Sequence, residues 1–292
     1  MSTILAVDVG GTNCRIGVAR SDAPDAVELV GQGPAPSSRD AFVALLRDRI
    51  AEHGAQALGI GIPGLTENTR CRWVPNLPSL DGLDLAEVVP GISIGLGNDA
   101  HLSLLAEARS GAAMGMDDAI LLAIGTGIGS AVLADGAIIG GNLGAACSFG
   151  WACADSDALP DDSCGWLERQ ASGSALDRLA RSSGWGDGTS LIARARNADP
   201  AALAALETPM HILGTTLVGA VALLAPRAVI LAGGVVGAFD VLAPLIESRL
   251  MRLLPPHLRQ VQLLAARHGP RAGLIGAAYA GALGPAWRTR HG

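Results

Sequence analysis

The strongest indication of the fold comes from residues 4–20, Ile4-Leu-Ala-Val-Asp-Val-Gly-Gly-Thr-Asn-Cys-Arg-Ile-Gly-Val-Ala-Arg20. Its first apolar run ends in a turn, Gly10-Gly11-Thr12-Asn13, and a second run begins at Cys14. Two apolar runs joined by a glycine-rich turn predict a β-hairpin, not the strand-to-helix step of a dinucleotide-binding fold.

The same pattern returns in the middle of the chain. Residues 120–133 again read as strand, Gly/Thr turn and strand. A weak internal repeat predicts two related halves, and strands alternating with helices indicate an α/β architecture. A hinge is expected near 111–118. Helices are predicted at 40–53 (capped by Asp40 and Gly54), 100–109, 164–182, 205–225 and 239–254. Further strands are predicted at 58–64 (running into a turn), 92–97 and 228–231. A surface loop is expected at 33–38, and a closing segment at 271–283.

Composition excludes several classes of protein. Hydrophobic residues make up 49% and charged residues 16%, which supplies a core and argues against long disorder. The net charge of −6, without a Lys/Arg cluster, argues against a nucleic-acid partner. The N-terminus lacks the features of a secretory signal, and the most apolar region, 212–239, is interrupted by Pro226 and by Gly233-Gly234 before either part reaches roughly 20 residues. We expect a cytoplasmic protein with no membrane contact, and its five widely spaced cysteines as free thiols.

Three glycine-rich turns follow apolar strands: Gly10-Gly11-Thr12, Gly125-Thr126-Gly127 and Gly233-Gly234. Glycine lets backbone N–H groups converge on a ligand, and threonine adds a hydroxyl donor, so such turns suit phosphate oxygens. One such turn alone is most simply a tight turn, whereas three at strand ends indicate a nucleotide site. Neither GxGxxG opening a helix nor GxxxxGK[ST] is present, so Rossmann and P-loop folds have no support.

Two aspartates stand at the predicted strand ends. Asp8 lies within an apolar strand, where an unpaired carboxylate is costly, so it is expected to hold Mg²⁺ through water or to bond the hairpin backbone. Asp99 follows Asn98 where a strand ends and a helix begins. It is either a simple helix cap or a catalytic base, which the helix N-terminus would keep ionised.

Eight segments in series cover almost the whole chain: AVDVGGTNCRIGVA (6–19), GIGIPG (59–64), VPNLP (74–78), GNDAHLSLLAE (97–107), LLAIGTGIGSA (121–131), WLERQASGSAL (166–176), VILAGGV (229–235) and AGLIGAA (272–278). Together they resemble the ROK family (repressors, open reading frames and kinases), which includes glucokinase-like enzymes, within the sugar kinase/actin/Hsp70 superfamily. The resemblance implies a two-domain, actin-like ATPase (ribonuclease H-like) α/β fold with an active-site cleft between the domains.

The resemblance also implies an ATP-dependent sugar kinase. Residues 1–115, with about 277–292, would contribute the sugar site and the catalytic base, Asp99, and residues 116–276 most of the ATP site. Phosphates would be held by Gly10, Gly11, Thr12, Asn13, Gly125, Thr126 and Gly127, the adenosine by Gly233 and Gly234, and the sugar by Gly64, Asn76, Asn98 and Glu168. Dimers are common in the family, so a homodimer is one expectation, and the sequence leaves the oligomeric state open.

The chain departs from the family in the second half of the sugar site. The family's Gly-Glu-x-Gly-His segment corresponds to residues 147–151, with Ser148 in place of the glutamate and Trp151 in place of the histidine. Trp151 would either stack on a ring face of the substrate or fill the space of the missing zinc loop. The family's zinc motif is also incomplete, because Cys153 and Cys164 remain without a CxC pair or the histidine, so no zinc is expected.

These changes predict a substrate recognised differently at the end far from the transferred phosphate. An amino sugar, a deoxy or anhydro sugar, or a cyclitol would suit the pocket better than glucose. Two alternatives stay open: a catalytically silent sugar-binding protein, and another phosphotransferase of the superfamily, such as an acyl-phosphate kinase or an ATPase activator. A ROK repressor is disfavoured because the first strand begins at about Thr3, which leaves no room for a preceding DNA-binding helix-turn-helix.

Overall fold

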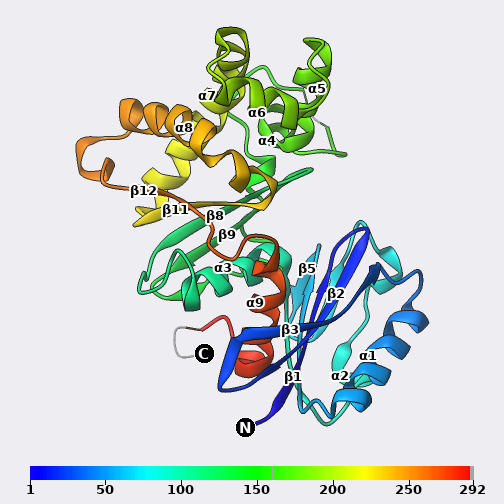
Figure 1. Ribbon diagram of the computed structural model, residues 1–292. Helices are drawn as coiled ribbons and strands as arrows, with labels where there is room; N and C mark the ends of the chain where they lie inside the picture. Colours follow the sequence, from blue (N-terminus) through cyan, green and yellow to red (C-terminus); the bar gives the residue numbers. More distant parts are fainter. Residues whose placement is uncertain (160, 290–292) are drawn as a thin grey trace. The chain divides into compact units, whose positions relative to one another are not determined.

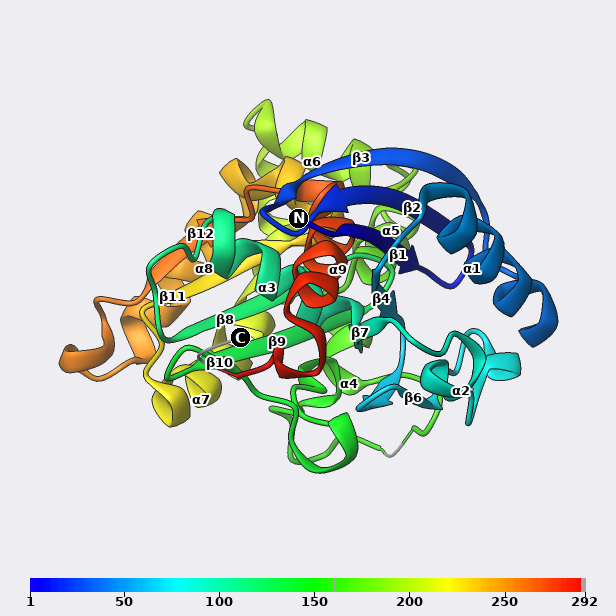
Figure 2. The same cartoon turned by 90° about the horizontal axis from the view of Figure 1, so that it is seen from below.

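The computed structural model describes residues 1–159 and 161–289 (Figures 1 and 2). The chain forms two compact units, which are described separately. The first unit comprises residues 1–115, 131–146 and 267 onward, and the second comprises 116–130 and 147–266. The predicted domains differ from these units by assigning 131–146 and 267–276 to the second half. The chain passes from the first unit to the second between Gly115 and Met116, within the segment where a hinge is expected.

The first unit is built on a five-stranded sheet. Its order is β3-β2-β1-β4-β7, with β1 at Thr3–Val9, β2 at Asn13–Arg20, β3 at Ala23–Pro34, β4 at Ala57–Ile62 and β7 at Ser93–Asn98. The antiparallel pairing of β1 with β2 confirms the predicted hairpin. The sequence did not predict β3, whose largely exposed residues include two prolines and two glycines and show no apolar alternation. Its position at the sheet edge explains why such a composition is tolerated.

Helix α9 (Ala272–Leu283) packs directly on this sheet, as Figures 1 and 2 show. A Cβ atom at Gly59 would overlap the carbonyl oxygen of Ala277, and one at Gly95 would overlap that of Ala280. These glycines therefore bring a helix close to the strands. Helix α1 (Arg39–His53) buries Phe42 in the core cluster that also holds residues of β1 and β4.

The ends of α1 correct one expectation. Ser38 is its N-cap, with its side chain accepting the N–H of Ala41, so the prediction of Asp40 as the cap was wrong. Gly54 ends the helix at φ 59°, as predicted. This unit also contains α3 (Asp99–Ser110), which ends at Gly111, α2 (Leu85–Val88), and the pair of strands β5 (Leu65–Glu67) and β6 (Arg70–Trp73).

The second sheet repeats the strand order of the first. It runs β10-β9-β8-β11-β12, with β8 at Ala119–Ile124, β9 at Ile128–Ala134, β10 at Ala137–Ile138, β11 at Ala228–Ala232 and β12 at Gln262–Ala265. In both sheets the first strand is central, its two successors lie on one side and the last two strands on the other. This order confirms the internal repeat inferred from the two glycine-rich turns.

Five helices belong to the second unit: α4 (Trp166–Ala171), α5 (Gly173–Ser182), α6 (Gly188–Arg196), α7 (Pro200–Leu224) and α8 (Phe239–Leu253). The sequence predicted α7 and α8, and it predicted a single helix at 164–182 where the structure has α4 and α5, divided at Ser172. It did not predict α6. By length and composition alone α7 could cross a membrane, and 44% of its apolar window is buried within the fold. Its buried side chains include Met210 and Leu213, and it packs against α4 and α8.

Candidate active site

Asp99 is the first residue of α3, directly after β7. The N-cap is Asn98, whose Oδ1 accepts the N–H of Ala100 at 2.9 Å. The Oδ1 of Asp99 also accepts that N–H, at 2.8 Å. Because Asn98 already caps the helix, capping alone does not account for Asp99.

Asp8, near the end of β1, pairs with a cation that the sequence reasoning missed. Arg15 is its cross-strand partner, and Nη1 of Arg15 lies 3.6 Å from Oδ2 of Asp8. The alternation of side chains along a hairpin is the signal that could have identified this pair. Burial nevertheless raises the pKa of Asp8, against the lowering effect of Arg15.

Gly61 on β4 lies close to both Asp8 and Asp99. A Cβ atom at Gly61 would lie 3.7 Å from Oδ1 of Asp8 and 3.9 Å from Cα of Asp99. Burial raises the pKa of Asp99 to about 6; the Ala100 N–H opposes this shift and the charge of Asp8 adds to it. Desolvation therefore outweighs the helix N–H groups, which still oppose the shift, and a carboxyl group with a pKa of about 6 is largely ionised near pH 7.

The first glycine turn and the predicted sugar-binding asparagines lie around these carboxylates. The N–H of Gly10 donates to the carbonyl of Asn13 at 2.7 Å. A Cβ atom at Gly11 would lie 3.2 Å from Cβ of Asn76, so the exposed Asn76 borders the turn. Asn98 Nδ2 donates to the carbonyl of Gly64 at 3.2 Å. The first unit thus contains nine of the predicted site residues: Asp8, Gly10, Gly11, Thr12, Asn13, Gly64, Asn76, Asn98 and Asp99.

The second unit contains a cavity of about 420 Å³ at the ends of β8 and β11. Gly125, Thr126 and Gly234 line it, as two of the three predicted glycine turns require. The carbonyl of Gly125 accepts the N–H of Gly173 at 2.7 Å, which fixes the turn to the start of α5. Gly233 has φ 79°, and a Cβ atom there would lie 2.6 Å from the carbonyl oxygen of Ile124, so only glycine fits.

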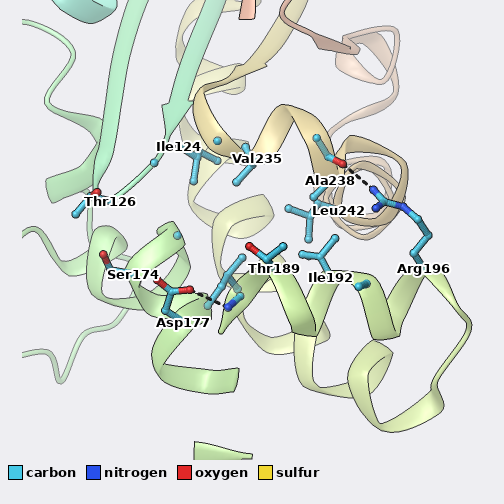
Figure 3. Close-up of a pocket in the computed structure, with 17 residues that line it drawn as sticks. Ile124, Thr126, Ser174, Asp177, Thr189, Ile192, Arg196, Val235, Ala238 and Leu242 are labelled. Atoms are coloured by element: carbon cyan, nitrogen blue, oxygen red, sulfur yellow. Dashed lines mark hydrogen bonds between the residues drawn. The ribbon is translucent and has the colours of Figure 1, made fainter. Parts of the chain in front are cut away.

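Several lining residues of this cavity were not predicted (Figure 3). Asp177 on α5 accepts the N–H of Gly188 at 2.8 Å, and Thr189 follows on α6. Arg196, at the end of α6, forms a bidentate ion pair with Asp240 and donates to the carbonyl of Gly237, each at 2.6 Å. Five of the seventeen lining residues lie on α6, which the sequence did not predict.

Glu168 on α4 is bound to backbone rather than left free. Its Oε1 accepts the N–H of Ile128 at 2.8 Å and its Oε2 accepts that of Gly165 at 3.2 Å. A Cβ atom at Gly127 would lie 2.6 Å from Oε1, so the glycine makes room for the carboxylate. Glu168 therefore braces the Gly125–Gly127 turn, a role that the sequence did not reveal.

Ser148 and Trp151 lie in the segment between β10 and α4. The N–H of Trp151 donates to the carbonyl of Ser148 at 3.0 Å, and 48% of Trp151 is exposed. Cys153 is exposed, whereas Cys164 places Sγ 3.7 Å from Oε2 of Glu168. Within residues 1–159 and 161–289, no cluster of three or more His, Cys, Asp or Glu side chains is arranged to hold a metal ion. All five cysteines are free thiols.

Comparison with known proteins identifies relatives over nearly the whole chain. A glucokinase of Thermotoga maritima is 27% identical, covering 94% of this chain and 96% of its own length. An N-acetyl-D-glucosamine kinase of Pectobacterium atrosepticum is 28% identical, with 93% and 96% covered. The crystal structure of a ROK family glucokinase from Streptomyces griseus, in complex with glucose and AMPPNP, matches with a TM-score of 0.75 and 27% identity over 94% of this chain and 98% of that chain.

The crystal structure of a ROK hexokinase from Thermus thermophilus matches with a TM-score of 0.77 and 26% identity over 96% of this chain and 98% of that chain. The fold of these two solved structures agrees with the predicted actin-like architecture. The model of the ROK family matches residues 4–281. The chain belongs to the ROK family.

Proposed function

We propose that this protein is an ATP-dependent kinase that phosphorylates a hydroxyl, most simply a primary one, of a hexose, an amino sugar or a cyclitol. The observation that carries the proposal is the environment of Asp99, a carboxylate with a pKa raised to about 6 at the start of α3. A base with a pKa near the working pH is suited to accept a proton in the transition state. ATP supply makes the cytoplasm the expected compartment.

In the proposed reaction the substrate hydroxyl donates its proton to the Asp99 carboxylate as its oxygen attacks the terminal phosphorus of ATP. The bond from that phosphorus to the bridging oxygen breaks, and ADP leaves. Phosphoryl transfer needs little covalent help from a protein, so orientation of the hydroxyl and stabilisation of charge supply most of the catalysis.

We assign the nucleotide to the cavity of the second unit. Its volume of about 420 Å³ lies in the range of small-molecule sites, and its walls combine the apolar Ile192 and Leu242 with the turn Gly125–Gly127. Backbone N–H groups of that turn would bind phosphate oxygens. The same chemistry makes Thr12 and the first turn candidates for phosphate binding in the first unit. The AMPPNP bound by the Streptomyces griseus enzyme supports a nucleotide as a ligand of this protein.

A magnesium ion fits the carboxylates of the first unit. Asp8 raises the pKa of Asp99, and a nearby divalent cation would relieve this repulsion. Because Asp8 already pairs with Arg15, we expect it to hold the ion through water rather than directly. When bound with ATP, Mg²⁺ would neutralise charge on the phosphate oxygens.

Substrate binding is assigned to Asn76 and Asn98 near the reacting hydroxyl, with Glu168, Ser148 and Trp151 at the far end. Asn98 is held by Gly64 and by the start of α3, so its position is determined before a sugar binds. Relatives named as glucokinases and as N-acetylglucosamine kinases support a sugar as the substrate class. Ser148 and Trp151 favour a substrate other than glucose.

ADP release in a panel of hexoses, amino sugars and cyclitols tests the proposal. Sugar-dependent ADP release is the expected result. Binding of sugars without turnover would instead identify a silent binding protein, and carboxylate-dependent turnover would identify an acyl-phosphate kinase. Either outcome contradicts the proposed function.

A further inference from the structure

A second cavity of the second unit, of about 510 Å³, shares no lining residue with the nucleotide cavity. Its walls come from the segment at 154–156, the first residue of α4, and the facing sides of α7 and α8. The residues that carry its chemistry are Asp155, Trp166, Thr208, His211, Thr215 and Arg249.

Arg249 is held in this cavity by packing of its aliphatic side-chain atoms and by one hydrogen bond from its Nε. A Cβ atom at Gly214 would lie 2.9 Å from Cβ of Arg249, so the glycine lets the arginine lie against α7. Nε of Arg249 donates to Oγ1 of Thr215 at 2.9 Å, and that hydroxyl donates to the carbonyl of His211 at 2.7 Å. A positioned guanidinium presents its terminal N–H groups as a fork that matches phosphate oxygens.

No carboxylate in the described part of the chain forms an ion pair with Arg249. The guanidinium is partly buried, and a partly desolvated charge without a counter-ion favours binding of an anion. His211 lines the same wall and adds a ring nitrogen to the donors. These groups therefore suit a phosphate group.

The opposite wall suits hydroxyls and a ring. Asp155 uses Oδ1 to accept the N–H of Asp157 at 2.9 Å, and its second oxygen is available to accept from a ligand hydroxyl. The Thr208 hydroxyl lines the cavity as well, and Trp166 supplies a broad apolar surface. A free phosphate would be repelled by Asp155 and would make no contact with the ring of Trp166. A phosphorylated sugar would instead bind Arg249 through its phosphate, Asp155 and Thr208 through its hydroxyls, and Trp166 through its ring.

We propose that this cavity binds a sugar phosphate, the product class of the proposed kinase, with the phosphate on Arg249 and the ring on Trp166. The inference rests on the proposed function for its choice of ligand. Trp166 begins α4, and Glu168 in the same helical turn bonds the N–H of Ile128 beside Gly127. Occupation of the cavity is therefore coupled to the nucleotide turn and changes the KM for ATP.

Glucose 6-phosphate, titrated by calorimetry, tests the binding site. The wild type is expected to show a binding step that Arg249→Ala weakens roughly tenfold or more, as loss of a charged hydrogen-bonding partner implies. Arg252→Ala, which removes an exposed arginine of the same helix, serves as the matched control and keeps the step. Asp99→Asn keeps it too, because Asp99 belongs to the active site. Equal affinity in wild type and Arg249→Ala would overturn the proposal.

Asp155→Asn gives a second, independent test at an exposed residue. It should weaken glucose 6-phosphate and strengthen inorganic phosphate, because it removes a hydroxyl acceptor and a repulsive charge together. Inorganic phosphate binding the wild type as tightly as the sugar phosphate would identify a simple anion site and overturn the assignment.

The coupling is tested by the KM for ATP with and without glucose 6-phosphate. Arg249→Ala should keep the basal turnover and lose the part of the effect that arises from this cavity. Identical responses of the wild type and Arg249→Ala would overturn the coupling. If no sugar of the panel causes ADP release while glucose 6-phosphate still binds in an Arg249-dependent way, the result counts against the proposed function alone.

Discussion

Asp8 on β1 and Asp99, which directly follows β7, stand at either side of β4, and the charge of Asp8 adds to burial in raising the pKa of Asp99 to about 6. Because of this arrangement, the pKa of the proposed base depends on the charge of Asp8 as well as on burial. It also gives the account several measurable consequences.

The first concerns the pH dependence of kcat/KM. The ionised form of Asp99 is the active one, so kcat/KM should fall about tenfold for each pH unit below its pKa of about 6. In Asp8→Asn the repulsion is gone and the positive Arg15 remains, so the acid limb of the profile should move to lower pH. A profile flat down to pH 4.5, or an acid limb that moves to higher pH in the variant, would contradict this account of Asp99.

Stability should respond to the same residue. The pKa of Asp99 is higher in the folded state than the roughly 3.9 of an unfolded chain, so its contribution to stability is present below pH about 4 and is lost as the pH rises through about 6. Asp99→Asn should therefore raise Tm by roughly 2–4 °C at pH 8 and little at pH 4. Asp25→Asn, an exposed change on β3, is the control. Equal effects of Asp99→Asn at both pH values would count against a desolvated carboxylate.

Arg196 is expected to support nucleotide binding. It lines the nucleotide cavity and ties α6 to the carbonyl of Gly237, which follows the third glycine turn. Arg196→Ala should raise the KM for ATP roughly tenfold with a smaller change in kcat, because it loosens a wall of the ground-state complex. Arg194→Ala is the matched control, since Arg194 lies on the same helix, pairs with Asp199 and does not line the cavity. Equal KM values in the two variants would exclude this role.

Ser148 and Trp151 are expected to set substrate preference. The double variant Ser148→Glu with Trp151→His restores the side chains usual in the family and should increase kcat/KM for glucose relative to other accepted sugars. Competition between glucose and the best substrate of the wild type measures the change. A folded double variant with no gain for glucose would show that these two positions do not control specificity.

The fold could be predicted to the extent that its strands are apolar and its turns are rich in glycine. The hairpin at β1 and β2 and its repeat at β8 were identified in this way. Strand β3 was missed because its edge position leaves only Val27 buried, without the alternation that marks a strand. Helix α6 is short and lies between loops, so its contribution to the nucleotide cavity was also missed.

The sequence places Asp99 where a strand ends and a helix begins, and the structure has it there, whereas its role as a base stays a prediction. Partners set by tertiary contacts were not predictable. The Arg15 counter-ion of Asp8 requires the hairpin register. The bond of Glu168 to the N–H of Ile128 joins segments 40 residues apart. The direction of the Asp99 pKa shift depended on a competition between burial and the helix N–H groups, which a sequence does not quantify.

The chemical step of Asp99→Asn, followed by rapid quench in a single turnover with saturating ATP and the best sugar from the panel, tests the central claim most directly. The account predicts a rate lower by roughly 10²–10⁴-fold, with AMPPNP bound as tightly as by the wild type. A rate close to that of the wild type would contradict it.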